Sequence, residues 1–156
     1  MKAAFCGTQE GMTKWQEKQL AESLRRLAIT EILLRDYLGS DRTAITTAIA
    51  CGIKTFHIYP INDSKKRAFY FPGIDRSNEW TLHKDGDGNV LYYKMEPIKA
   101  PLLAADDMIR DCEMLICTPK EFTHTLRSGT WSVVRKAWHA KKEAFVIPPV
   151  DREDEE

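Results

Sequence analysis

Glycine, serine and threonine gather at three places where an apolar run gives way to a helical pattern. These places are Gly7-Thr8, Gly39-Ser40-Asp41 and Ser128-Gly129-Thr130. The beginning of a helix presents unpaired backbone N–H groups and the positive end of the helix dipole, which together bind phosphate or carboxylate groups. Any single one of these residues more often acts only as a helix cap or a turn residue. Their recurrence at three junctions predicts a pocket for an anion.

Three arginines are candidates for contacting the same anion. Arg67 ends the run Lys65-Lys66-Arg67, although a charge run in a loop is more often simply solvated. Arg127 and Arg135 flank the third junction, where the fork of a guanidinium group suits phosphate. Arg135 lies well along the expected helix and can instead pair with an acidic neighbour. Arg127 is therefore the stronger candidate of the two.

Metal and cofactor chemistry has no comparable signal. The four histidines and four cysteines show no metal-ligand spacing. The segment from Asp85 to Asn89 resembles a calcium loop, but the glutamate that ends such a loop is missing, so we interpret it as a turn. The sequence predicts no metal site and no cofactor.

Apolar periodicity predicts alternating strands and helices along the chain. Strands are expected over 3–6, at the end of 29–38, over 53–59, as a hairpin within 80–95, and over 114–117 and 144–147. Helices are expected after a Thr13 and Gln16 capping box, after a cap at Ser40 or Asp41, over 100–110, and after a Ser128 cap. This order predicts an α/β fold: a Rossmann-like three-layer domain with a mostly parallel sheet and a β-hairpin insertion at about 79–96.

The chain has 156 residues, with 23 lysines and arginines balanced by 23 aspartates and glutamates. We expect one domain over 1–150, followed by a disordered acidic tail over 151–156. The balanced charge makes nucleic acid an unlikely partner, and no apolar stretch is long enough to span a membrane. The cysteines are interpreted as buried thiols, which favours a cytoplasmic location. Apolar residues Trp131, Val134 and Trp138 on the last helix favour a homodimer or higher homo-oligomer.

Several segments together resemble the SLOG superfamily, Rossmann-like proteins related to the cytokinin-activating "lonely guy" enzymes and to the DNA-processing protein DprA. The resemblance runs from about residue 4 to 147, and the opening GT-x-EGMT and later RSGTW elements are fairly specific together. The segments that carry it are 5–13 (FCGTQEGMT), Tyr59-Pro60, 67–69 (RAF), 115–119 (LICTP) and 127–131 (RSGTW) with Arg135.

The resemblance implies a site for nucleotides or NAD-derived molecules, such as a cyclic nucleotide or an ADP-ribose derivative. The SGT loop would hold a phosphate, and the loop after the first strand would close over the ligand. The positions that match are Gly7, Thr8, Arg67, Arg127, Ser128, Gly129, Thr130 and Arg135. Close relatives usually carry a GDC-x-GAD-like segment where this chain has only Gly39-Ser40-Asp41, and an Arg-Asn pair near Ala104-Ala105. Ligand identity is therefore not inherited from the resemblance.

The lonely-guy enzymes resemble this chain less closely, because the glutamate of their PGG-x-GT-x-x-E loop is replaced here by Val133. We therefore expect a binding module that senses or sequesters a phosphate-bearing, nucleotide-derived signal. The alternative is a nucleotide hydrolase that cleaves an N-glycosidic bond with Asp41 or Glu10 as its carboxylate. A DNA-processing accessory role is a third possibility, which the lack of a basic stripe disfavours.

Overall fold

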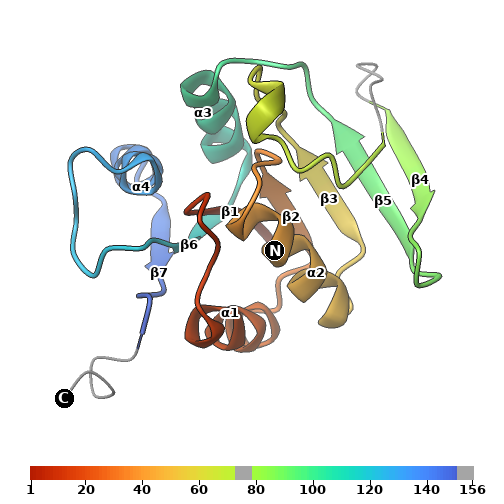
Figure 1. Cartoon of the computed structure of the whole chain (residues 1–156), viewed down its shortest axis with the longest axis horizontal. Coiled ribbons are helices and arrows are strands. Elements are labelled where there is room, and N and C mark those ends of the chain that lie inside the picture. Colours follow the sequence, from red (N-terminus) through yellow and green to blue (C-terminus); the bar gives the residue numbers. More distant parts are fainter. Residues whose placement is uncertain (73–78, 151–156) are drawn as a thin grey trace.

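The computed structural model describes residues 1–72 and 79–150 and forms one seven-stranded sheet (Figure 1). Its order is β4-β5-β3-β2-β1-β6-β7, and only the β4–β5 pair is antiparallel. The strands are β1 (Lys2–Gly7), β2 (Glu31–Leu34), β3 (Thr55–Ile58), β4 (Trp80–Lys84), β5 (Val90–Met95), β6 (Met114–Thr118) and β7 (Glu143–Val146). The expected α/β, Rossmann-like arrangement with a mostly parallel sheet is confirmed.

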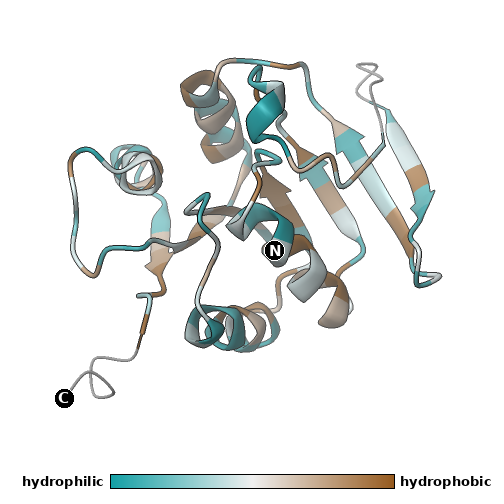
Figure 2. Cartoon of the chain, viewed as in Figure 1, coloured by the Kyte–Doolittle hydropathy of each residue, from teal (hydrophilic) through white to brown (hydrophobic). Residues whose placement is uncertain are grey.

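In the part of the chain that the structure describes, four helices cover the sheet in two layers. They are α1 (Lys14–Arg26), α2 (Ser40–Ala50), α3 (Pro101–Asp111) and α4 (Gly129–His139), and a 3-10 turn, η1, lies at Ser64–Lys66. Side chains of α1 and α2 pack in one core cluster with one face of the sheet, and side chains of α3 and α4 pack in a second cluster on the other face. Figure 2 shows hydrophobic residues concentrated on the central strands. Burying both faces explains why these strands are apolar runs rather than alternating ones.

Two helices begin where the sequence predicts. Thr13 caps α1 with a capping box, because its side chain accepts from Gln16 N at 3.1 Å while Gln16 Oε1 accepts from Thr13 N at 3.0 Å. Ser128 caps α4, accepting from Trp131 N at 3.2 Å. Local side-chain to backbone bonds set both helix starts.

Two local predictions were wrong. The second strand lies at Glu31–Leu34, in the middle of the 29–38 segment rather than at its end. The start of α2 has no side-chain cap: Gly39 occupies the cap position at φ 83°, and the Asp41 carboxylate instead accepts from Tyr37 N at 3.0 Å. Because the side chains of Ser40 and Asp41 are both buried, tertiary packing rather than capping preference sets their roles.

The predicted hairpin is present and extends the sheet. β4 and β5 pair from Trp80 opposite Lys94 to Lys84 opposite Val90, and β5 continues the parallel sheet beside β3. The connecting segment is a turn in which Asp85 Oδ1 accepts from Asp87 N and Asn89 N. The acidic tail over 151–156 and part of the polar segment before the hairpin, 73–78, lie outside the described residues.

The residues on which the expected oligomer depended are divided between core and surface. Trp131 and Val134 are buried within the chain's own core, whereas Trp138 is 50% exposed. Oligomerisation therefore stays a prediction. In the described part of the chain, none of the helices has the length and apolar character needed to cross a membrane. All four cysteines are free thiols, and three of them are buried.

The sheet fixes where a site can form. From β1 the chain moves outward through β2 and β3, and then returns to place β6 and β7 on the other side of β1. The direction of winding thus reverses between β1 and β6, which pair in parallel up to Gly7 opposite Thr118. In open α/β sheets the loops separate at such a switch point and leave a crevice at the carboxyl ends of the strands.

Candidate functional site

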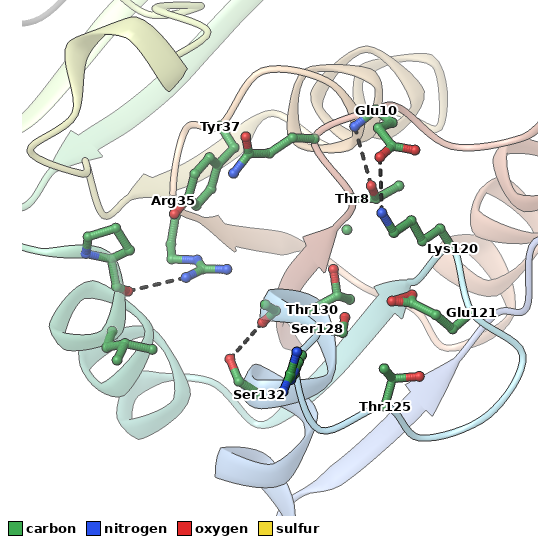
Figure 3. A pocket seen from close by; sticks show the side chains of 16 residues that line it. Thr8, Glu10, Arg35, Tyr37, Lys120, Glu121, Thr125, Ser128, Thr130 and Ser132 are labelled. Atoms are coloured by element: carbon green, nitrogen blue, oxygen red, sulfur yellow. Dashed lines mark hydrogen bonds and ion pairs between the residues drawn. The ribbon is translucent and has the colours of Figure 1, made fainter.

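A pocket of about 520 Å³ lies at the carboxyl ends of β1, β2 and β6, and is called the carboxyl-edge pocket below (Figure 3). It is formed by the loops after β1, β2 and β6 and by the first residues of α3 and α4. Its lining residues are Gly7, Thr8, Gln9, Glu10, Arg35, Tyr37, Pro101, Leu102, Lys120, Glu121, Thr125, Arg127, Ser128, Gly129, Thr130 and Ser132. This volume is within the usual range for small-molecule sites.

The beginning of α4 supplies unpaired amides to this pocket. Ser128 satisfies the N–H groups of Trp131 and Ser132, through its side chain and its carbonyl respectively. Within the described residues, the N–H groups of Gly129 and Thr130 have no hydrogen-bond partner. A Cβ atom added at Gly129 would meet nothing within 4 Å, so the backbone there is open. The helix start is therefore available to an anion.

Arg35 brings a buried positive charge to the same pocket. It directly follows β2, is only 7% exposed, and lies over the Tyr37 ring at 4.9 Å. Its guanidinium group makes one hydrogen bond to a described residue, from Nη1 to the Pro101 carbonyl at 3.2 Å. No carboxylate of the described residues lies within 4.0 Å of its guanidinium nitrogens. Most of the five guanidinium donors therefore have no partner among the described residues and are available to an anion in the pocket.

Close packing holds the β1 loop against the start of α2. A Cβ atom at Gly7 would lie 2.4 Å from Ser40 Cβ and 2.5 Å from Thr118 Oγ1. A Cβ atom at Gly39 would lie 2.2 Å from the Gln9 carbonyl oxygen, and Gly39 also has φ at 83°. Glycine is thus required at both positions, and the two loops meet behind the pocket.

Ser40 and Asp41 lie behind the pocket wall. Ser40 is fully buried, and its N–H donates to the Thr8 carbonyl at 3.2 Å. Asp41 is 2% exposed, and burial raises its pKa to about 7, although the positive charge of Arg35 opposes this rise. The start of α2 is thus buried and does not line the pocket. Of the three junctions, the helix start that opens into the pocket is that of α4.

The first junction also differs from expectation. Gly7 and Thr8 line the pocket, but α1 begins only at Lys14, and its capped start lies beside the carbonyl of Pro149, which accepts from Thr13 Oγ1. Gly7 and Thr8 therefore contribute a loop backbone to the pocket rather than a helix start.

Arg67 is not among the residues that line the pocket. Its Nε donates to Asp36 Oδ2 at 3.1 Å, and both side chains are buried. Burial raises the pKa of Asp36, while the charge of Arg67 opposes the rise. The Arg67 guanidinium also lies 4.2 Å from the centre of the Phe69 ring. Arg67 is thus part of the fold around the segment that follows β2.

Arg135 and Arg127 have different positions. Arg135 holds the β6–α4 loop, donating to the Thr125 carbonyl at 3.3 Å and the Leu126 carbonyl at 3.1 Å, and it lies 2.9 Å from His124 Nε2. Arg127 lines the pocket and makes no ion pair with a described residue. Arg135 therefore shapes the loop, and Arg127 is the arginine of the two that is placed for a ligand.

The candidate acidic positions also differ in where the fold places them. Glu10 lines the pocket, but its side chain is 71% exposed and pairs with Lys120 at 3.0 Å. Val133, at the position of the lonely-guy glutamate, is fully buried in the core. Glu121 lines the pocket, and its Oε2 is buried without a hydrogen-bond partner in the described residues.

Sequence reasoning missed Arg35, Tyr37 and Glu121. The signal for Arg35 was its place directly after the apolar run Ile32-Leu33-Leu34, because a residue that ends a parallel strand lies at the carboxyl edge. Because the strand was expected at the end of 29–38, Arg35 was not recognised as the residue that follows it. Glu121 lies in a loop, and its place depends on how residues 119–127 fold back toward α4.

Together the fold and the pocket define a Rossmann-like α/β protein with an anion-compatible cavity at the switch point of its sheet. Neither a protein-family model nor a curated protein matches this sequence.

Proposed function

We propose that this protein binds a small phosphate-bearing ligand of the nucleotide type in the carboxyl-edge pocket, and that it senses or sequesters that ligand. Membership of the SLOG superfamily, with a nucleotide, cyclic nucleotide or ADP-ribose derivative as ligand and a homo-oligomeric state, is part of this proposal. The carrying observation is the buried Arg35 guanidinium, which has no carboxylate within 4.0 Å among the described residues and shares a pocket with the open start of α4.

Electrostatics support a phosphate over a neutral ligand. The α4 start offers the two free amides of Gly129 and Thr130, and Arg35 offers a fork of donors on the same cavity. Phosphate accepts several such bonds at once, and bonds that involve ions contribute about 1.5 to 3 kcal/mol each. Arg127 adds a further positive charge at the rim.

The N-glycosidic hydrolase has less support than the binding module. Of its two proposed carboxylates, Asp41 is buried and accepts a hydrogen bond from Tyr37 N, and Glu10 is paired with Lys120. General acid or base catalysis needs a carboxyl group within hydrogen-bond reach of the reacting atoms. We therefore expect no free base, detected by chromatography, when the purified protein is incubated with AMP or NAD.

Titration calorimetry with inorganic phosphate, AMP and ADP-ribose tests the proposed function. Because Arg35→Met removes charge-assisted hydrogen bonds, affinity for all three should fall about tenfold or more. Arg25→Met removes an exposed arginine in the last turn of α1 and is the matched control. It should leave all three affinities unchanged. Thermal unfolding of each variant checks that it is folded. Equal affinities of wild type and Arg35→Met for phosphate would refute the proposal.

A further inference from the structure

Two cations line the carboxyl-edge pocket from different sides. Arg35 belongs to the segment after β2, whereas Lys120 belongs to the loop after β6. Figure 3 shows them on different sides of the cavity, with Ser128 and Thr130 of the α4 start between them. A phosphate held by Arg35 and the α4 start therefore leaves Lys120 available to a second anionic group.

The present partner of Lys120 is a weak one. Its Nζ donates to Glu10 Oε1 at 3.0 Å, and the hydrogen bond raises the pKa of Lys120, so the ammonium group is charged at neutral pH. The two side chains are 56% and 71% exposed. Exposed ion pairs contribute little to stability, because water screens them and ordering two long side chains costs entropy. The pair is therefore exchanged at small cost.

Glu10 is placed to compete with an anionic ligand. It lines the same pocket, and its backbone N–H donates to the Thr8 hydroxyl at 3.3 Å, which holds the loop beside the cavity. The carboxylate repels a phosphate and occupies the lysine that a phosphate would use. A phosphoryl group carries up to two negative charges and three acceptor oxygens, so it is a stronger partner for an ammonium group than a carboxylate is.

We propose that the ligand carries two linked phosphoryl groups, and that Lys120 binds the second group in exchange for Glu10. Arg35 and the α4 start bind the first. This inference rests on the proposed function. It adds that the pocket selects a diphosphate over a monophosphate, and that Glu10 opposes binding until the ligand displaces it from Lys120.

Five compounds distinguish the number and spacing of phosphoryl groups: inorganic phosphate, pyrophosphate, AMP, ADP and adenosine 3′,5′-bisphosphate. ADP and the bisphosphate both carry two groups, but the ribose separates them in the bisphosphate. Titration calorimetry measures the affinities of all five for wild type, Lys120→Met and Glu10→Gln, and phosphate is also titrated into Arg35→Met. Lys14→Met and Glu17→Gln are the controls, because they make the same changes in another exposed ion pair, in α1, away from the pocket. Thermal unfolding checks that every variant folds.

We expect wild type to bind pyrophosphate about tenfold more tightly than phosphate, and ADP about tenfold more tightly than AMP, as a further hydrogen bond between ions predicts. The bisphosphate should bind no more tightly than AMP. Lys120→Met should bring both ratios close to one. Glu10→Gln should raise the affinity for both diphosphates about threefold, since Lys120 is then free and a repulsive charge is gone. The two controls should leave every affinity unchanged.

The two proposals fail separately. If Arg35→Met loses phosphate binding but Lys120→Met keeps the wild-type ratios, or wild type has no preference for diphosphates, the role of Lys120 is wrong and the proposed function stands. The same holds if the bisphosphate binds as tightly as ADP, or if Glu10→Gln does not strengthen binding. If wild type does not bind phosphate, or Arg35→Met binds it as well as wild type does, the proposed function fails and this inference fails with it.

Discussion

The buried carboxyl group of Asp41 predicts an unusual dependence of stability on pH. It is 2% exposed, and burial raises its pKa from 3.8 to about 7, even though Arg35 opposes the rise. Because the pKa is higher in the folded state, the unfolded chain releases this proton first as the pH rises. The contribution of Asp41 to the free energy of unfolding therefore decreases between about pH 4 and pH 7, and is constant above that range.

The size of the effect follows from the interval between the two pKa values. One pH unit of that interval corresponds to about 1.4 kcal/mol, so an interval of roughly three units gives roughly 4 kcal/mol in total. Asp41→Asn keeps an oxygen that can accept from Tyr37 N, and it removes the titration. The stability of Asp41→Asn relative to wild type should therefore rise by about 2 to 3 kcal/mol between pH 5 and pH 8.

Urea unfolding followed by tryptophan fluorescence at pH 5, 6, 7 and 8 measures this difference. The extra amide hydrogens of asparagine shift the difference by a constant amount, and the other titrating groups cancel between the two proteins. Only the slope therefore tests the reasoning. Arg35→Met removes the charge that lowers the pKa of Asp41, so in that background the slope should extend to higher pH. A difference between Asp41→Asn and wild type that stays flat from pH 5 to pH 8 would refute the account.

Three further predictions concern two loops at the pocket and the start of α1. Gly39→Ala should destabilise the protein by more than about 2 kcal/mol in urea unfolding, because it combines a positive φ with a clash against Gln9. Gly52 also has a positive φ but lies in open space, so Gly52→Ala should cost only about 1 kcal/mol. Equal losses would contradict the close packing at Gly39. Thr13→Ala should cost about 1 kcal/mol in the same assay by removing the α1 capping box, and no loss would show that the cap is energetically silent. Arg135→Met should speed backbone hydrogen exchange within 123–127 without lowering protection in β1, because Arg135 donates to the carbonyls of Thr125 and Leu126; unchanged exchange would mean that another contact holds this loop.

The sequence alone determined the order of strands and helices and most of their places. Apolar runs and helical spacing are local patterns, and the caps at Thr13 and Ser128 are bonds between residues three apart. Such features depend on residues only a few positions apart, so they can be recognised in the sequence. The parallel sheet and the hairpin follow from them, as does the α4 start that opens into the pocket.

Only the tertiary structure decided which polar side chains reach the pocket. Arg67 is directed to Asp36, 31 positions earlier in the sequence, and Asp41 is buried, whereas Arg35 and Glu121 line the cavity. The partner of a charged side chain depends on which residues the whole sheet brings close in space. Separation along the sequence does not indicate that distance. The winding of the sheet reverses between β1 and β6, and the pocket lies at this point. The topology therefore determined which of the arginines and carboxylates line the pocket.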